Sequence, residues 1–363
     1  CPVTGHGQES DHLCPENAGA LMSRIPHIEG VLSADEVVQT AESIAALQLD
    51  SGMIPWFKDG HCDPWNHVET AIALDIAGLH QNAERAYEWL VDMQHADGWW
   101  FNYYLPGGIV EEPKLDTNVC AYIAAGVWHH WLCTWDRGFV DHLWPTVERA
   151  IEWVLSMRRH DGTILWAKEE HASPWDYALL TGSSSIWHAL TCAVNLAELI
   201  NEPKPHWSVA ADQLRAAITT RPNAFEPKTR WAMDWYYPVL TNAMEGDQAK
   251  ARLADLWDTF AMEGRGIRCV SDEPWVTAAE TAECSLAHAA VGDLSTATDL
   301  LYWTRAHRTD DGSYMTGIVY PSFEHFPAGE RTAYTGAAVI MAADAITASS
   351  PAAKLFLPTF AAD

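Results

Sequence analysis

The chain is poor in basic residues, and this shortage excludes one broad class of partner. Of its 363 residues, 22 are Lys or Arg and 49 are Asp or Glu, which gives a formal net charge of −27. Nucleic-acid binding depends on clustered Lys and Arg side chains that neutralise phosphates. We therefore expect no nucleic-acid partner, and a neutral or cationic partner instead.

Long apolar runs and a disulfide framework are also missing. No stretch approaches the roughly 18 to 20 apolar residues that cross a bilayer, and the first residues do not form a basic-then-apolar signal peptide. We therefore expect no membrane partner. The eight cysteines are widely spaced, and several fall in apolar helical stretches. This pattern favours reduced thiols and predicts a cytoplasmic location.

Amphipathic helices recur along the chain with a sixfold rhythm, which matters because repeats decide the fold class. Each of these helices has a one-sided apolar stripe, as Val147, Ile151 and Val154 illustrate at helical spacing. Four of them lead into an Asp-Gly or Ser-Gly turn. The predicted helices cover about 35–48, 82–94, 145–159, 206–219, 249–262 and 294–307.

A second set of helices alternates with the first and is apolar on nearly every side. A helix of this kind must be enclosed by protein. Six one-sided helices alternating with six enclosed ones predict an all-α (α/α)6 toroid, with an inner and an outer ring. The enclosed helices are predicted at about 66–79, 117–132, 184–199, 238–245, 277–290 and 331–346.

The ends of the chain differ from this pattern. Residues 1–24 show no periodicity, so we expect a flexible arm followed by a single catalytic domain at 25–363. Cys1, His6, His12 and Cys14 are irregularly spaced for a metal site. We predict no metal and no cofactor, and the sequence carries no signal for an oligomeric state.

The links from outer to inner helices are long, and they concentrate acids and aromatic residues at one mouth of the ring. Glycoside hydrolysis needs one carboxyl that donates a proton and a second that activates water or attacks carbon. Aromatic rings stack on sugars, and the chain has 19 Trp and 11 Tyr. The predicted substrate-binding residues are Trp56, Asp59, His61, Trp65, Tyr104, Asp116, Trp175, Tyr177, Asp234, Trp235, Tyr236 and Trp275, and the same links also carry the acids Asp63, Asp176, Glu280 and Glu324.

Helix capping is the competing interpretation of these acids. Asp63-Pro64 is typical of an N-cap followed by Pro at the first helical position. Ser173 to Asp176 and Thr277 to Glu280 both fit the capping-box pattern. Asp116, Asp234 and Glu324 have no equally clear capping pattern, which favours a functional role for them.

Three loop segments resemble those of glucoamylase-type α/α-toroid glycoside hydrolases. DGHCDPWNHVETAIAL resembles the first-loop segment that grips the sugar, which implies Asp63. SPWDYALLTGSSSIWHAL resembles the acid-bearing loop and implies Asp176. FEHFPAGERTAYTGAAV resembles the last-loop segment with the catalytic base and implies Glu324.

A closer resemblance covers most of residues 25–350. GMIPWF, GHCDPWNHVE, LDTNVCAYIAAGVWHHW and WDYALLTGSSS are similar to segments of the mycobacterial methylmannose polysaccharide hydrolases. The resemblance implies an endo-acting α-mannosidase that trims partly methylated α-1,4-mannan, with paired carboxylates and inversion. It makes Asp63 and Glu280 rival catalytic candidates, and the choice among the four acids stays open at this point.

Two other classes of protein would use a similar fold and similar site residues. A prenyltransferase or terpene cyclase on the same toroid would also have an aromatic-lined cavity, but the chain has neither DXDD nor DDXXD. A non-catalytic glycan-binding protein is the second alternative, and acids on all six loops argue against it. A polysaccharide lyase or epimerase is less favoured, because an acidic mouth would repel uronic acids.

Overall fold

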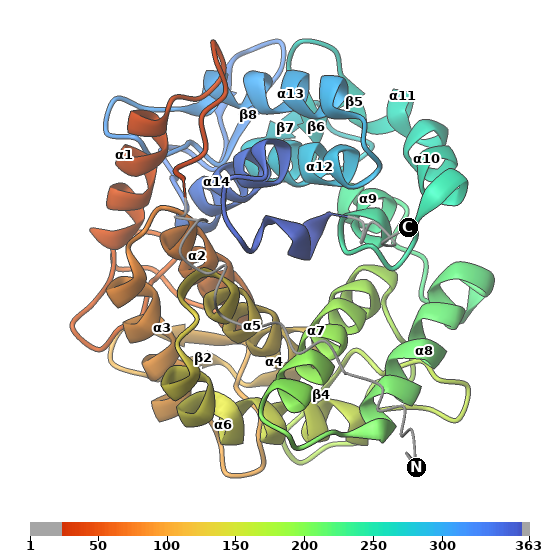
Figure 1. Cartoon of the computed structure of the whole chain (residues 1–363). Helices are drawn as coiled ribbons and strands as arrows, with labels where there is room; N and C mark the ends of the chain where they lie inside the picture. Colours follow the sequence, from red (N-terminus) through yellow and green to blue (C-terminus); the bar gives the residue numbers. More distant parts are fainter. Residues whose placement is uncertain (1–23, 358–363) are drawn as a thin grey trace, which may run out of the picture.

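The inner helices of the computed structural model, which describes residues 24–357, form a closed ring (Figure 1). Each inner helix packs against the next, and the last one returns to the first. They are α2 (Pro64–Ile76), α4 and α5 (Thr117–Ala121 and Ile123–Thr134, separated at Tyr122), α7 (Leu180–Leu199), α9 (Ala232–Leu240), α12 (Ala278–Ala290) and α14 (Ala333–Thr347). Their small and apolar residues are almost all buried, as a helix enclosed on every side requires.

The outer helices pack against the inner ones and bury one face each. α3 lies on α2, α6 on α5, α8 on α7, α10 on α9 and α13 on α12, while α1 lies on α14. The short helix α11 (Trp257–Phe260) follows α10. The outer helices are α1 (Ala34–Ala45), α3 (His80–Met93), α6 (Arg137–Ser156), α8 (Pro205–Thr220), α10 (Gly246–Asp255) and α13 (Leu294–Trp303). The helix-rich toroid predicted from periodicity is therefore confirmed.

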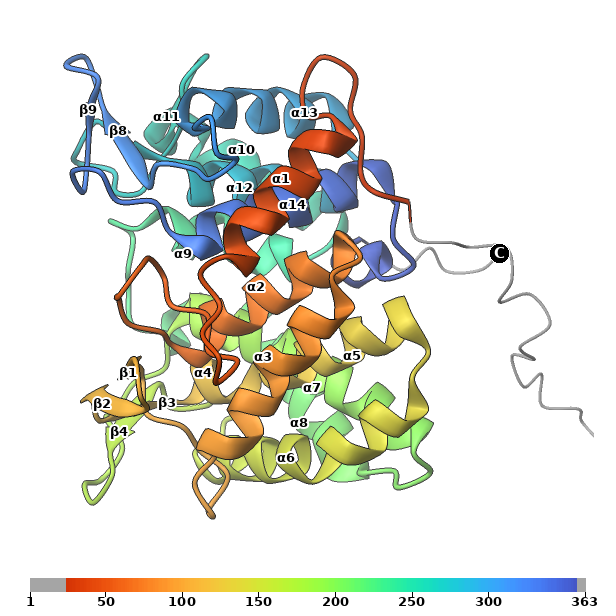
Figure 2. The same ribbon diagram turned by 90° about the vertical axis from the view of Figure 1, so that its left-hand side faces the viewer.

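Short β-strands occupy the long links from outer to inner helices, and an all-α prediction did not anticipate them. β1 (Tyr103–Leu105) pairs with β2 (Ile109–Glu112), and β3 (Lys114–Asp116) pairs with β4 (Ala167–Glu169). β5 (Ala261–Met262), β6 (Gly266–Arg268), β7 (Trp275–Thr277), β8 (Gly317–Val319) and β9 (Glu324–His325) form one antiparallel sheet in that order. Figure 2 shows the strands together at one end of the ring, where they flank its mouth.

Two helices begin earlier than predicted, for the same reason. The predicted helices at 145 and 238 both started at a proline, but α6 and α9 continue through Pro145 and Pro238. In α9, Pro238 cannot donate to the Asp234 carbonyl. That carbonyl instead accepts from Arg252 Nη2 at 2.6 Å, and the Trp235 carbonyl accepts from Arg252 Nε at 2.7 Å. The segment 233–238, predicted as a loop, is therefore helical.

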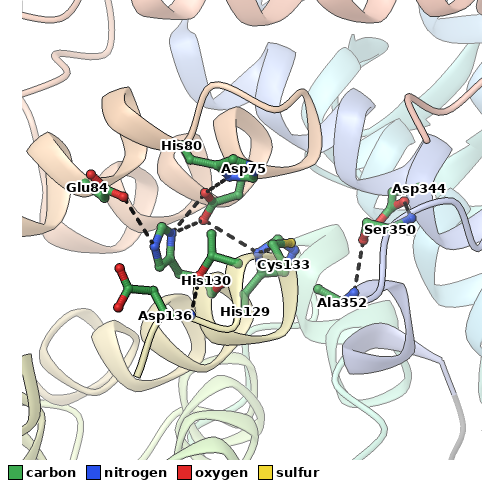
Figure 3. Close-up of polar contacts among 11 residues, drawn as sticks. Asp75, His80, Glu84, His129, His130, Cys133, Asp136, Asp344, Ser350 and Ala352 are labelled. Atoms are coloured by element: carbon green, nitrogen blue, oxygen red, sulfur yellow. Dashed lines mark hydrogen bonds and ion pairs between the residues drawn. The ribbon is translucent and has the colours of Figure 1, made fainter. Parts of the chain in front are cut away.

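The end of the ring opposite the mouth contains a buried carboxylate surrounded by imidazoles (Figure 3). Asp75, which is fully buried, accepts hydrogen bonds from His80 Nδ1 at 2.9 Å and from His130 Nδ1 at 3.0 Å. His129 Nδ1 lies 4.0 Å away. Burial acts to raise the pKa of Asp75, but these imidazoles outweigh burial and hold that pKa well below its usual range. The cluster ties α2, α3 and α5 together.

Several predictions about composition can be compared with the described residues. Within residues 24–357, the cysteines are free thiols, and all but Cys133 are buried. No helix in this part of the chain is long and apolar enough to span a membrane. The same part has no group of three or more His, Cys, Asp or Glu side chains arranged to hold a metal ion. The predicted flexible arm, with Cys1, His6, His12 and Cys14, lies outside the described residues, except for Arg24.

Candidate active site

A cavity of about 460 Å³ opens where the inner helices begin. Its lining residues come from the first turns of these helices and from the links that precede them. Backbone N–H groups at helix N-termini favour negative charge, so carboxylates are stabilised at such a position. The carboxyl groups that line the cavity are those of Asp63, Asp116, Glu280 and Glu283.

Asp63 is a helix cap and a cavity residue at once. It is the N-cap of α2, with Pro64 at the first helical position, as the sequence predicts. Its Oδ1 accepts from Asn66 N at 3.0 Å, and its Oδ2 accepts from Trp56 Nε1 at 2.7 Å and Asn66 Nδ2 at 2.8 Å. Burial raises the pKa of Asp63, while these donors act against burial. Capping and cavity lining therefore do not exclude each other here.

Asp116 is also an N-cap, which its sequence context did not reveal. It begins α4, and its side chain accepts from Asn118 N at 2.9 Å and Val119 N at 3.4 Å. The Trp166 indole N–H donates to its second oxygen. Burial raises the pKa of Asp116, and the nearby Lys114 ammonium acts against that rise. The expectation that Asp116 lacks a capping role was wrong.

Glu280 lies in the first turn of α12, after Thr277 at the N-cap position. The predicted capping box is not formed, because the Thr277 hydroxyl contacts the Glu280 carboxylate and makes no cap bond to the backbone. Tyr334, at the start of α14, also lines the cavity. Burial raises the pKa of Tyr334, and the charges of Glu280 and Asp63 raise it further. Tyr334 thus lies within electrostatic reach of both acids.

Two glutamates, Glu69 in the interior and Glu283 on the cavity wall, were not among the predicted site residues. Glu69 follows Asp63 on α2 and is 5% exposed, and Glu283 follows Glu280 by one turn on α12. Burial raises the pKa of both, and the Asp63 charge adds to the effect on Glu69. A signal for them exists in the sequence, since each is an acid within a helix that is otherwise enclosed by apolar residues.

Aromatic side chains form much of the remaining cavity wall. Trp56 and Trp65, which were predicted, line it, and Trp56 packs edge-on against Tyr334 at 4.9 Å between ring centroids. Tyr103, Trp166 and Trp231 also line it but were not predicted, as does the thioether side chain of Met233. In strand β1 the prediction named Tyr104, whose ring instead packs edge-on against Trp89 at 5.6 Å between centroids.

A second depression borders the cavity at its rim. It has a volume of about 520 Å³ and shares Lys114 with the cavity. The Lys114 ammonium lies 4.8 Å from the centroid of the Trp166 ring, and the predicted Trp175 lines the outer depression. The two hollows therefore meet at Lys114. A larger depression of about 890 Å³ over α1 is lined by surface residues and none of the candidate acids.

The structure places two of the four candidate catalytic acids outside the cavity. The Asp176 side chain is 97% exposed and pairs with Arg159. It also lies outside any helix start, because α7 begins at Leu180 and the predicted capping box at Ser173 does not form. Glu324 is exposed on the edge strand β9. Neither residue is brought together with Asp63 and Glu280.

Three predicted substrate-binding aromatics are packed in the protein interior instead. Tyr104 is 2% exposed, and its hydroxyl accepts from Phe101 N at 2.8 Å. Trp235 stacks on Phe260 at 5.5 Å. Tyr236 is fully buried and donates to Glu283. Trp235 and Tyr236 are buried because the segment that contains them is helical.

The remaining predicted binding residues lie around the cavity without lining it. Asp59 is exposed in a turn with φ 63°, and His61 Nδ1 is 2.9 Å from Glu111. The Asp234 carboxylate accepts a hydrogen bond from the Thr181 hydroxyl at 3.4 Å, and Thr181 rather than Asp234 lines the cavity. Tyr177 stacks on Trp175 at 6.4 Å, and Trp275 Nε1 donates to the Phe326 carbonyl at 3.0 Å.

Solved structures with the same overall architecture include sugar-active enzymes. A glycosidase variant aligns with a TM-score of 0.69 and 13% identity over 89% of this chain and 97% of its own. A D-mannose isomerase aligns at 0.67 and 13% over 88% and 99%. The cellobiose 2-epimerase of Spirochaeta thermophila aligns at 0.64 and 13% over 85% and 95%. At such identities the likeness concerns the fold.

A helical toroid with an acid- and Trp-lined cavity at its mouth defines, together with a close sequence relative, a glycoside hydrolase. That relative is the MMP endo-(1,4)-3-O-methyl-alpha-D-mannosidase of Mycolicibacterium hassiacum, which is 46% identical over 335 residues and 92% of both chains. The chain belongs to the family of this enzyme. An uncharacterized glycosyl hydrolase of Methanocaldococcus jannaschii is 27% identical over 40% of this chain and 22% of its own. No protein-family model matches the chain.

Proposed function

We propose that this enzyme cleaves internal α-1,4-mannosidic bonds of a 3-O-methylated mannan, with Asp63 and Glu280 as the catalytic pair. The observation that carries the proposal is that both acids line one Trp-rich cavity, whereas Asp176 and Glu324 do not. The named activity of the Mycolicibacterium relative, at 46% identity, supports the substrate. The oligosaccharide is the expected partner.

The hydrogen bonds of the two acids suggest how they divide the reaction. The Asp63 carboxylate accepts hydrogen bonds from N–H donors only, which favours its charged form. Burial raises the pKa of Asp63, which makes the carboxylate a stronger base. Glu280 contacts a hydroxyl, which can donate or accept. We assign water activation to Asp63 and proton donation to Glu280. We propose that the reaction inverts the configuration, with the attacking water held by Asp63 on the side of the sugar opposite Glu280.

The shape and chemistry of the cavity suit a methylated chain. O-methyl groups add apolar surface, which the indoles and Met233 can bury. The outer depression that meets the cavity at Lys114 supports an open groove, as cleavage within a chain requires. Sugar units on one side of the scissile bond would extend toward Trp175.

Finer features of the protein belong to the same proposal. We interpret the alternating helices as an (α/α)6 toroid in a single catalytic domain at 25–363. The free thiols of the described cysteines support the cytoplasmic location predicted from the sequence. The site chemistry needs no metal or cofactor, since two carboxyls suffice for inverting hydrolysis.

Steady-state kinetics on methylated manno-oligosaccharides test the catalytic pair. We expect Asp63→Asn and Glu280→Gln to lower kcat by at least about 1,000-fold, because each loses a proton-transfer group. The matched controls Asp176→Asn and Glu324→Gln should stay within about threefold of the unmodified enzyme, since both side chains are exposed outside the cavity. A large loss of kcat in Asp176→Asn or Glu324→Gln, with little loss in Asp63→Asn and Glu280→Gln, would contradict the assignment.

Rescue experiments then test the two roles. An aryl glycoside with a good leaving group should restore cleavage by Glu280→Gln, which no longer has to protonate the leaving oxygen. Azide should restore cleavage by an Asp63→Ala variant and yield a glycosyl azide of inverted configuration. If the two rescues are exchanged between the variants, the roles are reversed and our division of the reaction is wrong.

A further inference from the structure

Glu69 and Glu283 face a second, much smaller cavity inside the ring. This cavity has a volume of about 10 Å³, and Glu283 borders both it and the active-site cavity. The rest of its wall is aromatic or aliphatic and comes from the inner helices and the junction of α4 with α5. The lining residues besides the two glutamates are Tyr122, Tyr237, Leu240, Leu286, Ala338 and Met341.

No cation balances the two carboxyls at this cavity. Among the described residues that line it, none is Lys, Arg or His. The charged groups that act on them are Asp63 from α2 and Glu280 from α12. The neighbouring titratable groups on α9 and at the α4–α5 junction are the phenols of Tyr236, Tyr237 and Tyr122, and α14 contributes Ala338 and Met341. Two carboxyls that line one small cavity without a cation repel each other when both are charged, so we infer that the pair keeps one proton.

The contacts of the two residues indicate which one holds the proton. Glu283 accepts a hydrogen bond from the Tyr236 hydroxyl and reaches the open active-site cavity, and both features stabilise a charge. Glu69 is 5% exposed and has neither an ion-pair partner nor an opening to the active-site cavity. A neutral carboxyl at Glu69 needs an acceptor for its O–H, and Glu283 is the one carboxylate across the small cavity.

We propose that Glu69 is a neutral carboxylic acid that donates a hydrogen bond to the Glu283 carboxylate, and that the charge held at Glu283 acts on the active-site acids beside it. Glu283 lies one helical turn from Glu280 on α12, so the two carboxyls are neighbours on that helix. Glu69 and Glu283 are therefore positioning residues that act through Glu280. The second half of this inference rests on the proposed function of Glu280, and the first half does not.

Infrared difference spectroscopy on the intact enzyme tests the protonation state without any reference to activity. At neutral pH, the spectrum of the unmodified enzyme minus that of Glu69→Gln should contain a protonated-carboxyl C=O band. The spectrum of the unmodified enzyme minus that of Glu283→Gln should contain no such band, because Glu69 keeps its proton in that variant. The proposal would be overturned if the band were missing from the Glu69→Gln difference spectrum or present in the Glu283→Gln difference spectrum.

The pH dependence of kcat/KM tests the effect on Glu280. Glu69→Gln should keep the wild-type profile, because its amide N–H replaces the carboxyl O–H as donor to Glu283. Glu283→Gln should move the alkaline limb of the profile to lower pH by about one unit, because a negative charge next to the active-site acids is lost. Glu69→Leu should shift the same limb in the same direction, because Glu283 loses its donor and takes up a proton. If the pH profile of kcat/KM for Glu69→Gln matched that for Glu69→Leu, the result would contradict a neutral carboxyl at Glu69.

Two controls separate the possible failures. Melting curves should show that Glu69→Gln and Glu283→Gln remain folded, since both are isosteric and neither leaves an unpaired buried charge. If the rescue experiments show that Glu280 is the base, Glu283→Gln should move the acidic limb of the kcat/KM profile to lower pH instead. A kcat/KM profile that does not move in Glu283→Gln would then overturn the positioning role. The infrared result stands on its own if Glu280 proves to have no catalytic role.

Discussion

Asp75 shows how a single buried carboxylate can hold three helices together in this ring. Its oxygens accept from imidazoles on α3 and α5, and neither Asp75 nor His130 is exposed. A carboxylate in such a place is costly unless it is paired and hydrogen-bonded. Removal of its charge should therefore destabilise the protein even though Asp75 is far from the cavity.

We expect Asp75→Asn to lower the free energy of unfolding by about 3 kcal/mol near neutral pH, because the imidazoles lose their charged acceptor. The pKa of Asp75 is lowered in the folded state, so its contribution is present above the usual Asp pKa of about 4 and is lost as the pH falls. The pKa of His80 is raised by the hydrogen bond to Asp75, so that contribution is present below about pH 6.5 and is lost as the pH rises through the raised pKa.

Urea unfolding of both proteins across pH is the measurement. The difference in unfolding free energy should be largest between about pH 4 and 6.5, where Asp75 is charged and His80 is protonated. A difference that stays constant from acid to alkaline pH would show that the ionic contacts are not what stabilises this cluster.

The proposed catalytic acids were partly predictable at this scale. Asp63 and Glu280 were among the four candidates because their segments resemble those of the methylmannose polysaccharide hydrolases. Asp176 and Glu324 occur in similar segments, yet the first belongs to a link that continues to Leu180 and the second to an edge strand. The direction of a side chain within an irregular link depends on tertiary pairing, which local sequence does not encode.

Close packing between neighbouring helices is visible at Gly126 of α5. A Cβ atom at this position would lie 2.6 Å from Val68 Cγ1 on α2 and 2.8 Å from the Tyr87 hydroxyl on α3. Contacts this short cannot be accommodated without movement of the backbone or of buried side chains. The glycine therefore sets how closely α5 approaches its neighbours.

We expect Gly126→Ala to lower the free energy of unfolding by about 1 to 3 kcal/mol, which is typical of overpacking in a core. Gly182 in α7 is the matched control, because its nearest contact would be Asn118 Cβ at 3.5 Å. Gly182→Ala should be neutral or stabilise by up to about 1 kcal/mol through helix propensity. Equal effects of the two substitutions in denaturant unfolding would contradict this account of the packing.

At the level of elements, periodicity predicted the alternation of helices well and their boundaries less well. The helices predicted at 145–159 and 238–245 begin at a proline, which is common at the first helical position. In α9 a distant side chain, Arg252, binds the carbonyl that Pro238 leaves free, and the sequence around the proline holds no sign of it. The strands of the long links are only two to four residues long and pair within one link or between consecutive links, so they leave no periodic signal.

The whole molecule carries a large excess of negative charge. With 49 acidic and 22 basic residues, like charges repel one another across the folded surface. Salt screens such repulsion within a Debye length of about 8 Å at physiological ionic strength. The proposed substrate is neutral and gains nothing from this field.

We therefore expect the melting temperature to rise by about 1 to 2 °C between low salt and ~0.15 M NaCl, which corresponds to roughly 1 kcal/mol for a chain of this size. KM for a methylated oligosaccharide should stay constant over the same range. Calorimetry and initial-rate assays in matched buffers measure both. A KM that changes severalfold with salt would indicate a charged ligand and count against a neutral glycan.

The crystal structure of Asp63→Asn with a bound methylated manno-oligosaccharide tests the central claim most directly. The account predicts that the oligosaccharide occupies the cavity between Trp56, Trp166 and Tyr334. One glycosidic oxygen should lie within hydrogen-bond reach of Glu280, with the substituted side chain at position 63 on the opposite side of the same sugar. An oligosaccharide bound at Asp176 or Glu324, with the cavity unoccupied, would contradict the account.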